Sequence, residues 1–130
     1  MKNERFEAGL KKLHEIDGDA GKKVIDSLAS IAPDFAQYLI EFPFGDVYQR
    51  PGLDVKSREI ATVAALTALG HSLPQLNVHI NGALNVGCKP EEIVEVIIQM
   101  SVYAGFPAAL NAMFVAKEVF QERGILQDEQ

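Results

Sequence analysis

Residues 74–105 read PQLNVHINGALNVGCKPEEIVEVIIQMSVYAG, and this stretch decides the fold. It contains two apolar-periodic runs, each with a proline near its start and a glycine just past its end. Proline suits a first helical turn and glycine suits the residue that follows a last turn. The stretch therefore predicts two helices, one from Pro74 to Gly87 and one from Pro90 to Gly105. The short connection between them favours antiparallel packing of neighbouring helices.

Helical periods continue on both sides of this pair, and no run alternates as a strand would. A helix after Asp54 is apolar nearly all round, which predicts that it forms the buried centre of the fold. Further helices are expected over residues 3–16, around residues 24–28, from Pro33 to Pro43, and from Pro107 to Gly124. A chain of 130 residues is expected to form one domain. The predicted fold is an all-α helical bundle that occupies residues 1–130.

The segment from Pro43 to Leu53 holds two prolines and two glycines, so it is expected to lack regular structure. Irregular segments of this length are uncommon inside compact domains and often serve function. A plain connector held in place by its aromatic side chains explains the segment equally well. Both interpretations stay open at this point.

Charge and cysteine content exclude several classes of function. The net charge is −6, and basic residues are adjacent only at Lys11-Lys12 and Lys22-Lys23, so nucleic-acid binding is not expected. Cys88 is the single cysteine, which excludes an internal disulfide and a four-cysteine zinc site. No signal peptide or membrane-spanning run is visible, which predicts a cytoplasmic protein. The modest excess of apolar residues suggests a subunit interface in a homo-oligomer.

His79 is the histidine most suited to chemistry. It shares an apolar-facing stripe with Leu76 and Ala83, and Gln75 lies one turn before it. A hydrogen-bonded core histidine would show the same pattern, while the alternative is an acid or base in a partly desolvated pocket. A metal site is not expected, because no nearby acid completes a ligand spacing. Asn77, Asn81 and Asn85 form a separate stripe at spacing four.

Three charged residues are further candidates. Glu59 lies in the first turn of its helix, where the helix dipole alone favours a carboxylate. Arg58 precedes it, and Arg50 lies in the expected loop. Each arginine either braces the fold or binds a substrate carboxylate in a bidentate pair.

Three stretches together resemble the carboxymuconolactone decarboxylase family. They are residues 79–87 (HINGALNVG), 90–97 (PEEIVEVI) and 103–112 (YAGFPAALNA), and the match extends from about residue 6 to residue 124. Upstream, Gly45-Asp46 and the run from Arg50 to Leu53 resemble the loop of the authentic decarboxylases. The resemblance implies an all-α, alkylhydroperoxidase D-like fold, commonly assembled as hexamers.

The resemblance implies two possible activities. The redox branch of the family uses a Cys-x-x-Cys pair just before the histidine, and residues 71–78 contain no cysteine. Thiol peroxidase activity is therefore disfavoured, because that chemistry needs a thiolate and a resolving partner. The other branch decarboxylates 4-carboxymuconolactone to 3-oxoadipate enol-lactone in aromatic breakdown, without a cofactor. A paralogue with another small acidic or lactone substrate, or a non-enzymatic oligomer, stays open as an alternative.

The decarboxylase resemblance also implies roles for individual residues. His79 falls on the family histidine and would transfer the proton, with Glu59 orienting a partner or relaying a proton. Arg50 or Arg58 would bind the substrate carboxylate, with Gln75 beside the histidine. The expected partners are a small acidic lactone and further copies of the chain.

Overall fold

The computed structural model describes residues 3–126, and these form seven α-helices and one π-helical segment without a strand. The all-α expectation is therefore confirmed for the described residues. The chain divides into two compact units, which we call unit 1 and unit 2; unit 1 ends at Val55 and unit 2 begins at Lys56. No helix among residues 3–126 is long and apolar enough to cross a membrane.

Unit 1 begins with an amphipathic helix, α1 (Glu4–Asp17). The side chain of Asn3 caps it by accepting a hydrogen bond from the backbone N–H of Phe6 at 2.8 Å. Its buried stripe is Phe6, Gly9, Leu13 and Ile16. Helix α2 (Ala20–Leu28) covers the residues around 24–28 where a helix is expected, and α3 (Pro33–Leu39) begins at the predicted proline.

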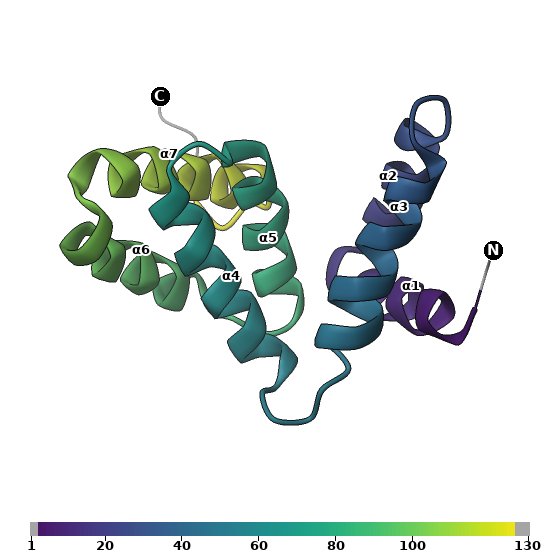
Figure 1. Ribbon diagram of the computed structural model, residues 1–130. Coiled ribbons are helices and arrows are strands. Elements are labelled where there is room, and N and C mark those ends of the chain that lie inside the picture. Colours follow the sequence, from purple (N-terminus) through teal and green to yellow (C-terminus); the bar gives the residue numbers. More distant parts are fainter. Residues whose placement is uncertain (1–2, 127–130) are drawn as a thin grey trace. The chain divides into compact units, whose positions relative to one another are not determined.

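The prediction that Pro43 ends the third helix is wrong. Helix α3 runs without a break into a π-helical segment, η1 (Ile40–Val47), which contains Pro43 (Figure 1). A proline in an α-helix interior clashes with the carbonyl four residues earlier and lacks an N–H to donate. The wider π turn accommodates it, and the carbonyl of Pro43 accepts a hydrogen bond from Tyr48 N five residues later at 2.8 Å.

Two glycines let α1 and η1 approach closely. A Cβ atom at Gly9 would collide with the backbone oxygen of Ile40, and one at Gly45 would collide with the backbone oxygen of Arg5. Only residues without a side chain permit this backbone-to-backbone contact. Side chains reinforce it, because Arg5 pairs with Asp46 at 2.8 Å and with the buried Glu41 at 3.1 Å.

The irregular connection is shorter than the sequence predicts, since it covers residues 48–54. The ring of Tyr48 lies 5.0 Å from that of Phe44, centroid to centroid. Gln49 donates hydrogen bonds to the carbonyls of Ala8 and Phe44 at 3.2 and 3.0 Å. These contacts fit the interpretation of this segment as a connector held by its aromatics.

Unit 2 contains α4 (Val55–Leu69) apart from its first residue, α5 (Leu73–Asn85), α6 (Pro90–Ala104) and α7 (Phe106–Glu122). Gly87, Gly105 and Gly124, where the sequence predicts helix ends, each follow the end of a helix, and Gly70 follows the end of α4. Helix α7 packs against both α5 and α6. Their core contains Leu76, Ile80, Ala83, Ile93, Ile97, Ala112, Ala116 and Val119, among others.

The expectation that the helix after Asp54 forms the buried centre of the fold is wrong for the single chain. Helix α4 buries one stripe, formed by Glu59, Val63 and Thr67 at spacing four. Ala61, Ala65 and Leu69 lie exposed on other faces of the helix. Helix α7 buries more residues and is the central helix of unit 2. Two of the three buried positions of α4 are polar, and this feature leads to the candidate site.

Candidate functional site

A buried carboxylate and a histidine meet inside unit 2. The Nδ1 atom of His79, on α5, lies 2.9 Å from Glu59 Oε2 and 3.4 Å from Glu59 Oε1, on α4. The side chain of Glu59 is fully enclosed, whereas that of His79 keeps 19% of its surface exposed. The structure thus brings together the two residues that the sequence singles out for catalysis.

The helical stripes explain how this pair forms. Glu59 occupies the same face of α4 as Val63 and Thr67, so the apolar packing of that face draws the carboxylate inward. Leu76 and Ala83 are fully buried on the stripe of α5 that carries His79. A buried carboxylate is costly unless a partner compensates it, and the imidazole is such a partner.

The geometry fixes which ring nitrogen faces the carboxylate. With Nδ1 engaged by Glu59, a ligand would have to approach the ring at Nε2. A carboxylate at Nδ1 also stabilises positive charge on the ring, as in pairs where an acid orients a catalytic histidine. The arrangement can therefore hold a proton at Nε2 and deliver it.

Of the three other predicted site residues, two lie in the same unit as this pair. Arg58 precedes Glu59 in α4 and is half-buried, and Gln75 lies one turn before His79 and is exposed. Arg50 lies in unit 1, where its backbone N–H donates to the carbonyl of Val47 at 3.2 Å. Thus Arg58 and Gln75 share a unit with the histidine, and the roles assigned to all three residues stay predictions.

The asparagine stripe is separate from the pair, as the sequence indicates. Asn81 donates to the backbone carbonyl of Asn77 at 3.0 Å. The guanidinium of Arg123 donates to the side-chain oxygens of Asn81 and Asn85, each at 2.9 Å. The hydrogen bonds of Arg123 hold the end of α7 against α5, and they take no part in the Glu59–His79 contact.

Sequence reasoning missed the contacts that anchor the first turn of α4. Lys56 Nζ lies 3.1 Å from Glu92 Oε1, on α6. The backbone carbonyl of Lys56 accepts a long hydrogen bond, 3.8 Å, from the thiol of the buried Cys88. The backbone N–H of Lys89 donates to Glu92, and together with Lys56 it holds the pKa of Glu92 below its ordinary value. Glu91 and Glu92, which follow Pro90, are the sequence feature from which the capping contact of Glu92 could have been predicted, because acidic residues often cap a helix start.

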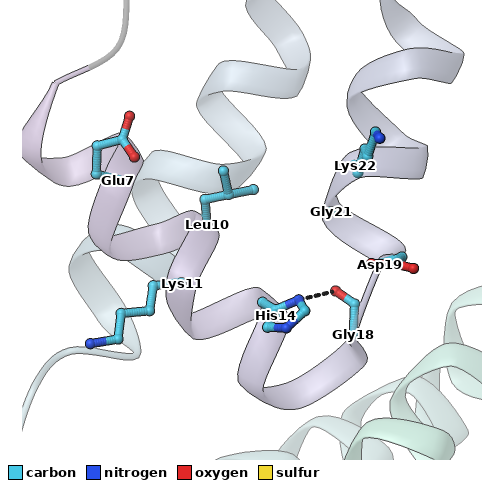
Figure 2. Close-up of a pocket in the computed structure, with 8 residues that line it drawn as sticks. All are labelled: Glu7, Leu10, Lys11, His14, Gly18, Asp19, Gly21 and Lys22. Carbon is cyan, nitrogen blue, oxygen red and sulfur yellow. Dashed lines mark hydrogen bonds between the residues drawn. The ribbon is translucent and has the colours of Figure 1, made fainter.

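The remaining histidines lie elsewhere. His71 pairs with its neighbour Ser72 at 3.2 Å and is exposed. His14 lines a hollow of about 420 Å³ between α1 and α2, and its Nδ1 lies 3.1 Å from the carbonyl of Gly18 (Figure 2). Glu7 and Lys11 point away from that contact in the same view, so the charges do not converge on one point. Residues 3–126 contain no group of three or more metal-ligating side chains.

Comparisons with known proteins agree with the sequence motifs. The model of the carboxymuconolactone decarboxylase family matches residues 33–118. A 4-carboxymuconolactone decarboxylase of Acinetobacter baylyi is 35% identical over 123 residues, which cover 94% of this chain and 91% of that protein. A nitrosuccinic acid decarboxylase of Metarhizium robertsii is 29% identical, over 90% of this chain and 82% of that protein.

A third relative, an uncharacterized protein of Paracoccus denitrificans, is 35% identical over 74% of this chain and 72% of its own length. Two similar proteins are thus decarboxylases by name, and they match nearly the whole chain. The matched residues include both Glu59 and His79. The chain belongs to the carboxymuconolactone decarboxylase family.

Proposed function

We propose that this protein decarboxylates a small carboxylated lactone, 4-carboxymuconolactone, to 3-oxoadipate enol-lactone. The observation that carries the proposal is the hydrogen bond between His79 Nδ1 and the enclosed carboxylate of Glu59. The similarity to the Acinetobacter baylyi decarboxylase supports the choice of substrate.

The proposed reaction needs an electron sink, and the substrate supplies it. When the carbon–carbon bond to the departing carboxylate breaks, its electron pair moves through the ring alkene onto the lactone carbonyl oxygen. A proton delivered to the carbon beside that carbonyl then gives the enol-lactone and carbon dioxide. No cofactor is required by this balance of electrons and protons.

His79 is assigned the proton transfer in this reaction. Its Nε2 would deliver the proton to carbon, while Glu59 holds the ring and stabilises its positive charge. A positioned proton donor of this kind contributes typically about 10²–10⁴-fold to a rate. The partial exposure of His79 supports access from a ligand, since a fully enclosed histidine would favour a purely structural role.

Arg58 is assigned to a substrate carboxylate in preference to Arg50. It is half-buried and precedes Glu59 in the same turn of α4, so it lies in the same unit as the pair. A guanidinium can hold a carboxylate through two parallel hydrogen bonds. Gln75, one turn before His79, is the second group proposed to touch substrate.

A second candidate is decarboxylation of a different small acid. The similarity to a nitrosuccinic acid decarboxylase favours it, because the family fold supports more than one named substrate. Both candidates share the need to lose carbon dioxide and then protonate a carbanion-like carbon. The same Glu59–His79 pair would serve either substrate.

An assay of the purified wild-type protein separates these candidates. We expect the ultraviolet absorbance of 4-carboxymuconolactone to change on addition of protein, with turnover at least tenfold faster than with nitrosuccinate. Faster turnover of nitrosuccinate would favour the second candidate. Absence of carbon dioxide release from both acids, with folded protein, would reject the proposed function.

A further inference from the structure

Helix α4 carries Glu59, and the position of this helix sets the distance from Glu59 to His79. Among the described residues, α7 approaches α5 and α6 closely along the backbone, whereas α4 approaches no other helix of unit 2 to that extent. Side chains of α4 pack in the core of unit 2 from Ile60 onward, with Val63 and Leu66 also contributing. These contacts all follow Glu59 in the helix, so the turn that precedes Glu59 needs a separate anchor.

Lys56 supplies that anchor at two points. It lies one turn before Glu59 in α4. Its side-chain nitrogen, Nζ, lies 3.1 Å from Glu92 Oε1. Its backbone carbonyl accepts the long hydrogen bond, 3.8 Å, from the thiol of Cys88. Both the side chain and the main chain of Lys56 are thus bound to the segment that leaves α5 and begins α6.

The segment that binds Lys56 is held in place by its own hydrogen bonds. The backbone N–H of Lys89 donates to Glu92 Oε1 at 2.9 Å, and the backbone N–H of Glu92 donates to the carbonyl of Lys89 at 3.0 Å. The hydrogen bond from Lys89 and the ammonium group of Lys56 hold the pKa of Glu92 below its ordinary value, so Glu92 is an anion at neutral pH. The acceptor for Lys56 is therefore both charged and fixed at the start of α6.

A hydrogen bond connects the same segment to the helix that carries His79. The backbone N–H of Cys88 donates to the carbonyl of Ala83 at 2.9 Å. Ala83 lies one turn after His79 on the same face of α5. Contacts therefore lead from Lys56 through Cys88 back to the helix of His79, and they tie the start of α4 to α5.

We propose that Lys56 and Glu92 are positioning residues, whose ion pair holds the start of α4 where the carboxylate of Glu59 meets His79 Nδ1. Helical side chains lean toward the N-terminus of their helix, so the carboxylate of Glu59 lies over the turn that Lys56 anchors. The effect of the ion pair on the rate rests on the proposed function. Its effect on the geometry of the Glu59–His79 contact requires no substrate.

The position of the carboxylate controls which ring nitrogen of His79 carries the proton. A carboxylate only accepts hydrogen bonds, so Nδ1 of a neutral ring donates to Glu59 and Nε2 carries no proton. Displacement of the carboxylate removes this preference, and the neutral ring then exchanges between its two tautomers. Misplacement of a reacting group by about 1 Å can cost about 100-fold in rate. We expect a smaller loss here, because an ion pair between two half-buried side chains is individually weak.

Variants of the ion pair measure its effect on the rate. Lys56→Met removes the charge and keeps the length of the side chain. Glu92→Gln also removes a charge, but its amide oxygen can still accept the hydrogen bond from Lys89. Each should lower kcat at least about threefold with KM unchanged, and the double variant should lose no more than either alone. Lys56→Arg keeps an ion pair and should retain the wild-type rate. Glu91→Gln, the exposed neighbour of Glu92, is the matched control and should have no effect.

NMR of the ring nitrogens supplies a readout that requires no substrate. At a pH where the ring is neutral, the Nδ1 and Nε2 resonances of His79 should be far apart in the wild type, and they should move toward each other in Lys56→Met and in Glu92→Gln. Lys56→Arg and Glu91→Gln should keep the wild-type separation. If the wild type released no carbon dioxide, the proposed function would fail, and this measurement would still test the positioning role.

A Glu59→Gln background tests whether the ion pair acts through Glu59. In that background Lys56→Met should cost nothing further in kcat, because the carboxylate that it positions is absent. Wild-type ring resonances in Lys56→Met would overturn the proposal, as would an unchanged kcat of this variant in an active protein. A further loss of rate in the Glu59→Gln background would overturn it as well. So would losses that multiply when Lys56→Met and Glu92→Gln are combined.

Discussion

At the scale of single residues, the central feature is a carboxylate that the fold encloses completely. Glu59 is buried on a stripe that apolar residues would otherwise occupy, and it lies against His79 at 2.9 Å. Burying such a charge costs desolvation free energy, so a fold tolerates it only with a compensating partner. A role of the pair in proton transfer would explain why this destabilising burial is present.

The first prediction concerns Glu59→Gln. The amide keeps the size of the side chain but supplies no negative charge at His79 Nδ1, so the protonated ring loses its stabilisation. We expect kcat to fall roughly 10²-fold or more with little change in KM, because the interaction matters most during proton transfer. Steady-state kinetics measure both constants. A kcat within threefold of wild type would contradict the assigned role of Glu59.

The second prediction concerns Thr67, on the same buried stripe. Its hydroxyl has no hydrogen-bond partner among the described residues, although the side chain is buried. Replacement of an unsatisfied hydroxyl by a methyl group of similar shape removes a desolvation cost. We expect Thr67→Val to raise the free energy of unfolding by up to about 1 kcal/mol in urea denaturation. A loss of stability of the same size would show that the hydroxyl has a partner.

At the scale of elements, the crossing of α1 and η1 shows how glycine and ion pairs define local packing. Gly9 and Gly45 admit a backbone contact that any side chain would block. Arg5 then fastens the crossing from the surface through Asp46 and Glu41. The sequence could not reveal this crossing, because a proline normally ends an α-helix and the π-helical turn that admits Pro43 has no pattern of its own.

The third prediction tests this crossing with Gly9→Ala. The added methyl group would meet the backbone of Ile40, which cannot move aside as a flexible side chain can. We expect a loss of about 1–3 kcal/mol in the free energy of unfolding, as for overpacked sites. Gly52→Ala is the matched control, because nothing lies within 4 Å of the added atom. Equal stabilities of the two variants would contradict the described contact.

The fourth prediction concerns the pH dependence of the Arg5–Asp46 pair. The hydrogen bond from Arg5 holds the pKa of Asp46 below its ordinary value of 3.8. A carboxyl with a lowered folded pKa stabilises the fold above its ordinary value, and this contribution is lost as pH falls through the lowered value. The stability difference between wild type and Asp46→Asn should therefore be largest near neutral pH and vanish in strong acid.

Chemical denaturation across that pH range measures the difference. Asp26→Asn, an exposed change on α2, is the control and should show no comparable trend. Because the Arg5–Asp46 pair is exposed to solvent, the effect should also weaken in high salt. A difference that is independent of pH would contradict the ionic account.

At the scale of the whole molecule, the all-α, alkylhydroperoxidase D-like fold class expected from the sequence is confirmed by family membership and by the helices of the described residues. The helices flanking Gly87 and Gly105 were predictable, because proline and glycine mark their ends. Which faces of α4 are buried was not predictable, because composition cannot tell whether an apolar face is covered by the same chain or by another. Ala61 and Ala65 show this, because they are apolar and exposed in the single chain.

The candidate site was also predictable only in part. His79 stands out in the sequence by its place on an apolar stripe, but its pairing with Glu59 joins residues 20 positions apart on different helices. Periodicity places each residue on a face of its own helix and does not state which faces meet. The family resemblance suggested the pair, and the packing of α4 and α5 provides its geometry.

The most direct test of the central claim is the rate of 4-carboxymuconolactone decarboxylation by wild type and by His79→Ala. If His79 transfers the proton, the wild type turns over and the variant loses about 10²–10⁴-fold in kcat while it keeps its helical circular dichroism. If a folded His79→Ala protein decarboxylates at the wild-type rate, His79 is not the proton-transfer group and the account of this site is wrong.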